Sequence, residues 1–305
     1  MVYLLDHDHL KSVPIEQIKA AGEQSRLCVF SFDEFASVSG VLGIPEKIRN
    51  ECVSCSISKF ESHEGFDFIM LNIPDGIDHY STSQRVCLYL TPQMLVFVCN
   101  DQQQISSIVA EIEAREIKGV SLGKILHLFF DRLTVDDSLE LEKIEQEIAK
   151  LEEELVVVKK SDFAFLVSFR KRLLTLKVYY EQLLEIYEEI EQNENGLIDQ
   201  KELRHFKILT GRANRLYNGV LNLRDYVTQV REAFQTQIDI NLNSVMKVFT
   251  VITSVFFPLT LIVGWYGMNL QMPEFGWRYG YLFVIGIIVS TAGATLYYFK
   301  KNKWF

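Results

Sequence analysis

The apolar C-terminal part of this chain contains side chains with uncharged oxygen atoms, and these are the first candidates for a functional role. Asn243, Thr253, Thr260 and Asn269 lie in or beside the charge-free run Val248–Gln271. Carboxamide and hydroxyl oxygens accept hydrogen bonds from water without carrying a charge. Such groups could line a path for water, whereas carboxylates at the same place would hold a cation too tightly to release it.

Six residues before and within this run recur at spacings of three and four, which predicts that they share one face of a helix. They are Asn243, Met246, Phe249, Thr253, Phe257 and Thr260. The small polar members could pass water, and the three large apolar members could form constrictions that close by dewetting. The alternative is that the phenylalanines face lipid or a second span. Pro258 removes one backbone hydrogen bond from the same helix and predicts a bend or a tolerated kink.

Other candidate ligands and nucleophiles give weaker signals. Cys52 and Cys55 have the spacing of half a zinc site, but no second pair matches them, and we interpret both as small buried residues of a strand. The five cysteines predict reduced thiols in a cytosolic compartment. Four histidines without helical ligand spacing are interpreted as surface residues: His7, His9, His63 and His79. No phosphate-binding glycine loop or nucleophile constellation occurs, so we do not expect an enzyme.

Two apolar segments must position the neutral oxygens. Val248–Gln271 and Tyr279–Phe299 contain no charged residue, and about 21 helical residues span roughly 31 Å, the thickness of a bilayer core. Aromatic residues gather at both ends of the segments, as at membrane interfaces. We therefore predict two transmembrane helices in place of the alternative, a buried hairpin of a soluble core.

Charge predicts the orientation of these helices. Lys247 precedes the first, and Lys300, Lys301 and Lys303 form a basic tail at the inner mouth, after the second. By the positive-inside rule both termini face the cytoplasm, in a multi-pass protein of the plasma (inner) membrane. The net charge of -9 argues against nucleic acid as a partner.

Residues 1–120 predict a cytoplasmic α+β domain, a sheet with packed helices. Four strands are expected at Leu27–Phe32, Phe66–Leu71, Arg85–Leu90 and Met94–Cys99. Helices are expected near Pro14–Glu23, Asp33–Leu42 and Gln102–Glu116, with turns at Pro74–Gly76 and Thr91–Pro92.

Residues 121–245 predict long coiled-coil stalk helices, because apolar residues recur at alternating three and four over several turns. Asn193–Gly196 is the clearest break, where we expect the second long helix to end in a glycine cap. No helix-breaking residue lies between Gly219 and Pro258. The third long helix should therefore continue into the first span.

The sequence Gly267-Met268-Asn269, followed by Met272-Pro273-Glu274 and a second span ending in lysines, resembles the CorA family of divalent cation transporters. Flanking segments such as Phe257–Thr260 are also similar to that family. The segment between Asn269 and Met272 is shorter than in well-known members.

The resemblance implies a homo-oligomeric funnel, a pentamer, in the lipid bilayer. Its first span (246–267) would line the pore, and an outer loop (268–278) would carry the ion entrance. The second span (279–299) and the basic tail (300–305) would follow. The ion-entry residues would be Gly267, Met268, Asn269 and Glu274. Magnesium would be the substrate, with cobalt or nickel as further substrates, and also the intracellular regulator at sites that we cannot place; no other cofactor is implied.

Two other functions stay open from the sequence. A zinc or other divalent metal transporter of the same family is the nearer one, although Met268 and Glu274 favour magnesium. A membrane-anchored coiled-coil sensor or scaffold without a pore is the other. The acidic faces of Glu140–Glu154 and Glu185–Glu194 could concentrate cations, or be ordinary solvated helix surfaces.

Overall fold

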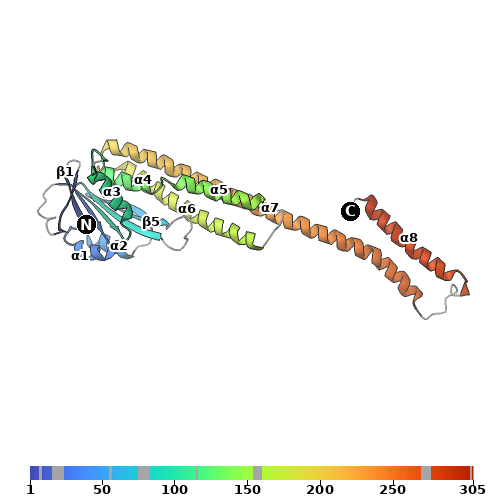
Figure 1. The fold of residues 1–305 in the computed structure, drawn as a ribbon. Helices are drawn as coiled ribbons and strands as arrows, with labels where there is room; N and C mark the ends of the chain where they lie inside the picture. The colour runs from blue at the N-terminus through green and yellow to red at the C-terminus, as the bar shows by residue number, and fades with distance from the viewer. Residues whose placement is uncertain are drawn as a thin grey trace. The chain divides into compact units, whose positions relative to one another are not determined.

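The structure is a computed structural model of the 305-residue chain. It describes residues 1–6, 9–15, 24–54, 57–74, 83–114, 116–153, 160–268, 276–302 and 304. The chain divides into two compact units, the first ending at Arg231 and the second beginning at Glu232. Figure 1 shows the order of the elements along the chain.

The first unit contains a seven-stranded sheet with the strand order β2-β1-β3-β7-β6-β5-β4. The strands are β1 (Val2–Asp6), β2 (His9–Ser12), β3 (Arg26–Phe30), β4 (Lys59–His63), β5 (Phe66–Pro74), β6 (Ser83–Thr91) and β7 (Met94–Cys99). Among the described strands, the β3–β7 pair is the only parallel one, and the other pairs are antiparallel. All six residues of β7 are buried, as expected for a central strand covered on both faces.

Helices cover both faces of the sheet. On one face, α1 (Phe32–Val38) and α2 (Glu46–Ser54) pack Phe35 and Ile48 into a core with Phe30 and Val98. On the other face, Phe97 meets the Phe129 ring of α4 (Leu122–Arg132) at 5.1 Å between centroids, and α3 (Gln103–Glu113) packs beside α4. The alternation of side chains along each strand explains this division.

The four predicted strands are confirmed as β3, β5, β6 and β7, and so are the predicted helices near α1 and α3. The helix expected near Pro14–Glu23 falls largely on residues outside the described part. The strand expected around Cys52 is wrong, because Cys52 is a buried residue of α2. Its apolar neighbours recur at helical spacing, Ile48 being four residues earlier. Cys55 lies outside the described residues.

Three long helices follow and confirm the predicted stalk pattern. They are α5 (Asp137–Glu153), α6 (Lys160–Gln192) and α7 (Gln200–Tyr266). The apolar residues of each repeat are buried, among them Ile144, Tyr187 and Val220, all fully covered. Packing of these seams holds the three helices together.

The break between α6 and α7 differs in detail from the expected glycine cap. The helix α6 ends at Gln192, and Asn193 takes the left-handed backbone conformation that directly follows the helix, with φ 47°. Asparagine tolerates this conformation because its amide bonds to the local backbone; here it bonds to both the N–H and the carbonyl of Ile198. Gly196, at φ 60°, closes the next turn.

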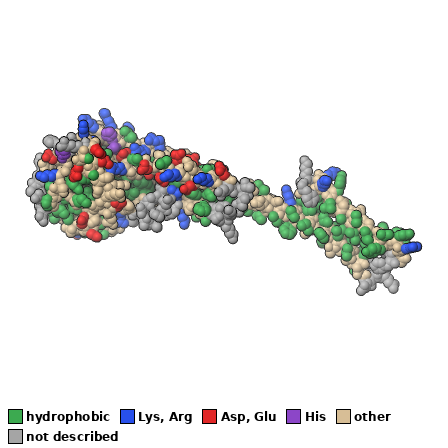
Figure 2. All heavy atoms as spheres, viewed as in Figure 1, with side chains coloured by type: hydrophobic (Ala, Val, Ile, Leu, Met, Phe, Trp, Pro, Cys, Tyr) green, Lys and Arg blue, Asp and Glu red, His purple; other side chains and the backbone are tan. Residues whose placement is uncertain are grey.

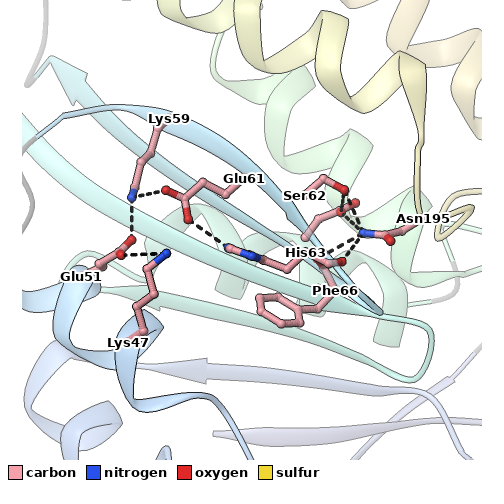
Figure 3. Close-up of polar contacts among 9 residues, drawn as sticks. Lys47, Glu51, Lys59, Glu61, Ser62, His63, Phe66 and Asn195 are labelled. Carbon is pink, nitrogen blue, oxygen red and sulfur yellow. Dashed lines mark hydrogen bonds and ion pairs between the residues drawn. The ribbon is translucent and has the colours of Figure 1, made fainter.

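The loop after α6 is anchored to the β4–β5 hairpin by Asn195 (Figure 3). Its Nδ2 lies 2.9 Å from Ser62 Oγ and 2.7 Å from the His63 carbonyl. It also lies 3.2 Å from the Phe66 carbonyl and 2.7 Å from Asp67 Oδ1. These contacts fix the chain shortly before α7 begins, so they position the start of the long helix on the sheet.

Charges around this anchor are largely compensated. Burial raises the pKa of the Asp67 carboxyl, which is 4% exposed, although hydrogen bonds from Asn195 and Ser62 partly offset the rise. Farther along β4, Lys59 lies 2.5 Å from Glu51 and 2.6 Å from Glu61. Burial lowers the pKa of Lys59, but these two carboxylates outweigh it and raise the pKa to about 12.

We expect Asn195→Ala to lower the free energy of unfolding by about 2 kcal/mol, because it leaves a buried carboxylate without its nearest donor. Since the pKa of Asp67 is raised in the folded state, the neutral acid is favoured there, and the loss should be larger at pH 8 than at pH 4. Thermal unfolding of the detergent-solubilised chain at both pH values measures this. Asn218→Ala, which removes an exposed amide bonded within α7, is the control. Equal losses for both variants would contradict the anchoring role.

The second unit contains the C-terminal part of α7 and α8 (Gly280–Lys301). The helix α7 has 67 residues and continues through Pro258 to Tyr266, as predicted from the lack of breakers. Both α7 and α8 include a window long and apolar enough to cross a membrane, only 6% of it buried in either case. Figure 2 shows hydrophobic side chains over this part and charged side chains gathered over the first unit.

Candidate functional site

The C-terminal end of α7 contains a position that only glycine fits. The N–H of Gly267 donates to the Val263 carbonyl at 2.8 Å, and that of Met268 donates to the Trp265 carbonyl at 3.3 Å. A Cβ added at Gly267 would lie 2.9 Å from the Val263 carbonyl oxygen. Real Cβ atoms do not approach a backbone oxygen so closely, so the turn excludes any side chain here. The sequence did not identify Val263 as the partner, although the four-residue spacing of helical hydrogen bonds could have done so.

Some residues predicted from the sequence lie beyond the described part. Asn269 and Glu274 of the predicted ion entrance are among them, as is Lys303 of the basic tail. Lys300 and Lys301 are described, and both lie in the last turn of α8. Cationic side chains are favourable at a helix C-terminus because they face the negative end of its dipole.

The six residues predicted to share a helix face do share one in α7. Asn243, Thr253 and Thr260 are exposed, and the large apolar members are strongly exposed too: Met246 62%, Phe249 60% and Phe257 75%. Phe257, Thr260 and Met268 also line one open hollow of about 400 Å³. The two phenylalanines therefore do not pack against the second apolar helix of the same chain, which removes one of the alternatives considered for them.

A different side of α7 is covered. Val251 is buried, and the half-buried Val255, Pro258, Ile262 and Tyr266 follow at spacings of three and four. With about 3.6 residues per turn, these residues lie opposite Phe249, Thr253 and Thr260. Among the described residues of this unit, α8 is the only other helix, so α8 covers this side. Tyr266 also lines a hollow together with Trp277, which precedes α8, and Tyr281, in the first turn of α8.

The threonine hydroxyls on the uncovered face are already oriented. Thr253 Oγ1 donates to the Phe249 carbonyl at 2.8 Å, and Thr260 Oγ1 donates to the Phe256 carbonyl at 2.8 Å. A hydroxyl that has given its only proton to the backbone can only accept further hydrogen bonds. These oxygens are therefore acceptors for donors such as the water molecules around a cation.

Fixed metal sites are not evident among the residues that the structure describes. No group of three or more His, Cys, Asp or Glu side chains that could hold a metal occurs in the described ranges. Cys28, Cys52, Cys87 and Cys99 are all buried, and burial raises the pKa of the Cys28 and Cys99 thiols to about 12. Such thiols stay protonated and do not bind metal readily.

The fold and the site define a class: a membrane protein whose α/β domain is followed by a very long helix and a second apolar helix. The sequence model of the family described as "CorA-like Mg2+ transporter protein" matches residues 33–301. The chain therefore belongs to this family, and the fold class predicted from the sequence is confirmed.

Individual relatives agree with this assignment. The cobalt/magnesium transport protein CorA of Thermotoga maritima is 29% identical over 256 residues, covering 81% of this chain and 72% of the relative. The magnesium transport protein CorA of Helicobacter pylori is 36% identical over 98 residues, covering 32% of this chain and 30% of the relative. The complete structure of the CorA magnesium transporter from Methanocaldococcus jannaschii superposes with a TM-score of 0.84. That comparison has 17% identity and covers 100% of this chain and 99% of the other, so it shows the fold.

Proposed function

We propose that this protein conducts divalent cations, magnesium foremost, across the plasma (inner) membrane. The observation that supports the proposal most is the uncovered face of α7. Polar hydrogen-bond acceptors lie along this face from Asn243 to the Gly267 turn, on the side opposite α8. Membership of the CorA-like family supports the same function, and the named relatives are magnesium or cobalt transport proteins. Cobalt and nickel are the further substrates that we propose.

The chemistry of the face suits a hydrated ion. Magnesium is small and hard and releases its water reluctantly. Thr253, Thr260 and the Asn269 carboxamide present neutral acceptors to water that donates hydrogen bonds. Met268 borders the same hollow as Thr260. An entrance of this kind recognises the hydration shell and leaves it in place, and Glu274 adds negative charge to attract the cation.

Conduction requires several copies of the chain. Two spans cannot enclose a water-filled path, and the bare face of α7 would line the axis of a homo-oligomer, which we propose to be a pentamer. The three exposed apolar residues Met246, Phe249 and Phe257 would then form rings that close by dewetting. No ATP is needed, because a dication gains roughly 4.6 kcal/mol per 100 mV of inside-negative potential.

The basic residues place both termini in the cytoplasm in this proposal. Lys247 precedes the first span, and Lys300 and Lys301 follow the second. The first unit is then cytoplasmic and able to sense internal magnesium. We propose that magnesium bridges acidic groups of neighbouring copies and holds α7 in a closed position, since a continuous helix transmits movement of the domain to the pore.

Uptake by the purified protein in liposomes tests the transport proposal. We expect Mg²⁺ influx driven by an inside-negative potential, and Asn269→Ala should reduce it at least about tenfold, equivalent to about 1.4 kcal/mol of barrier. Zinc should compete less well than cobalt. Unchanged influx in the variant would remove Asn269 from the entrance, and no influx in the wild type would favour a sensor or scaffold. Vesicles preloaded with magnesium should show inhibited influx if the ion is also the regulator.

A further inference from the structure

The chain leaves the two parallel strands β3 and β7 toward opposite faces of the sheet. After β3 the chain enters α1, whose Phe35 packs on the sheet face that carries Phe30 and Val98. After β7 it enters α3, which packs beside α4 on the opposite face, where Phe97 meets Phe129. Figure 1 shows the two pairs of helices on the two faces of the sheet. Where neighbouring parallel strands send their connections to opposite faces, a crevice opens at the carboxyl ends of the strands, and ligands bind there.

A cavity occupies this position. It has a volume of about 670 Å³ and is lined by Phe32, the first residue of α1, and by Cys99, Asn100 and Asp101 at the end of β7. Gln84 and Arg85 of β6 also line it. Cavities of roughly 300–1,000 Å³ with a few polar groups on an apolar wall are typical of small-molecule sites. All these lining residues belong to the first unit.

The Arg85 guanidinium is the cationic group of the cavity wall. Its Nη1 donates to the Val53 carbonyl at 3.1 Å and the Cys52 carbonyl at 3.4 Å, in the last turn of α2. Its Cζ lies 6.0 Å from the centre of the Phe32 ring. The Nε is buried and has no hydrogen-bond partner among the described residues. A fixed guanidinium with an unused donor is suited to a planar or tetrahedral oxyanion.

Asp101 adds a negatively charged hydrogen-bond acceptor to the cavity wall. Its Oδ1 accepts from the N–H of Gln103 at 2.9 Å, at the start of α3, and no hydrogen bond to the second oxygen is found in the described part of the chain. The carboxylate is the anionic group of the wall, so it is free to accept from hydroxyls or amines. Phe32 offers an apolar ring, and rings pack on aromatic faces with about 1 kcal/mol of added stabilisation.

We propose that this cavity binds a nucleoside monophosphate. The phosphate would pair with Arg85, the ribose hydroxyls would donate to Asp101, and the base would pack on Phe32. The one guanidinium of the described cavity wall can pair with one phosphate group, and the further phosphates of a triphosphate would find no second cation there and would be repelled by Asp101. The site is independent of the conduction path, because none of its residues lies in α7 or α8.

Calorimetric titration of the full-length, detergent-solubilised protein with AMP and GMP tests the proposal. We expect saturable binding of at least one of them, with ATP and inorganic phosphate at least tenfold weaker. Arg85→Gln and Asp101→Asn should each weaken binding at least tenfold. The second variant keeps the acceptor for Gln103, so it distinguishes a lost ligand contact from lost folding. Arg49→Gln, which breaks only the exposed pair with Glu46 in α2, should bind normally.

Three results would overturn the proposal. They are no saturable binding of either nucleotide up to millimolar concentration, equal affinity for inorganic phosphate, and unchanged affinity in Asp101→Asn. The titration needs no ion flux, so failure of the nucleotide site and failure of the transport proposal are separate outcomes.

Discussion

Gly267→Ala should abolish most divalent cation uptake while the protein still folds and inserts. The added Cβ would meet the Val263 carbonyl at 2.9 Å, so the last turn of α7 must open or shift. Because the proposed entrance residues Met268 and Asn269 follow directly in the sequence, a shift of even a few tenths of an ångström would misplace the acceptors that we propose for the ion. We expect influx into liposomes to fall at least about thirtyfold, corresponding to roughly 2 kcal/mol of barrier.

A glycine in α8 provides the matched control. At Gly286 an added Cβ would have no described atom within 4 Å, and alanine favours a helix by about 1 kcal/mol relative to glycine. Gly286→Ala should therefore conduct normally and be slightly more stable. If Gly267→Ala also conducted normally, the close turn would have no part in the entrance.

Phe257→Lys should block conduction without preventing insertion. Phe257 is the most exposed of the three large apolar residues on the uncovered face, at 75%. If every copy places this residue at the pore axis, each lysine repels a passing dication by about 1.7 kcal/mol at 5 Å even in bulk water. Several copies together should lower influx by more than about a hundredfold, measured in liposomes with equal amounts of incorporated protein.

The same substitution tests whether this face of α7 borders the pore or the lipid. A lysine at the centre of a lipid-facing helix costs about 3 kcal/mol on insertion scales, so a lipid-facing Phe257 would give less protein in the membrane. Val289→Lys, at an exposed position of α8 (64%), is the comparison and should lower membrane incorporation. Loss of incorporation for Phe257→Lys, with normal flux from the inserted fraction, would contradict the pore assignment.

The regulation that we propose depends on the continuity of α7. Its start is positioned by the Asn195 contacts with the β4–β5 hairpin, and the same helix carries the uncovered face and the Gly267 turn. A movement of the sheet, passed on through this hairpin, would therefore reach the proposed entrance through one element. This is why a regulatory ion bound to the first unit could act on the pore.

The sequence by itself determined the class of the protein and the elements of its long-helical part. Charge-free runs of bilayer length, apolar seams and the absence of breakers before Pro258 are local patterns, and each one fixes a helix without help from distant residues. The same holds for the shared face from Asn243 to Thr260, because the helical period alone places those residues together.

Only the tertiary structure decided which sides of the helices are covered and where distant segments meet. Periodicity could not tell whether Phe249 and Phe257 face α8, since a helix apolar all round gives no preferred side. The strands β1, β2 and β4 are short and partly polar, so their pairing, and not their composition, makes them strands. The Asn195 anchor joins residues at least 128 positions apart in sequence, and the contacts of Arg85 at the cavity join residues at least 32 positions apart. Contacts of that range follow from strand order, which the sequence did not reveal.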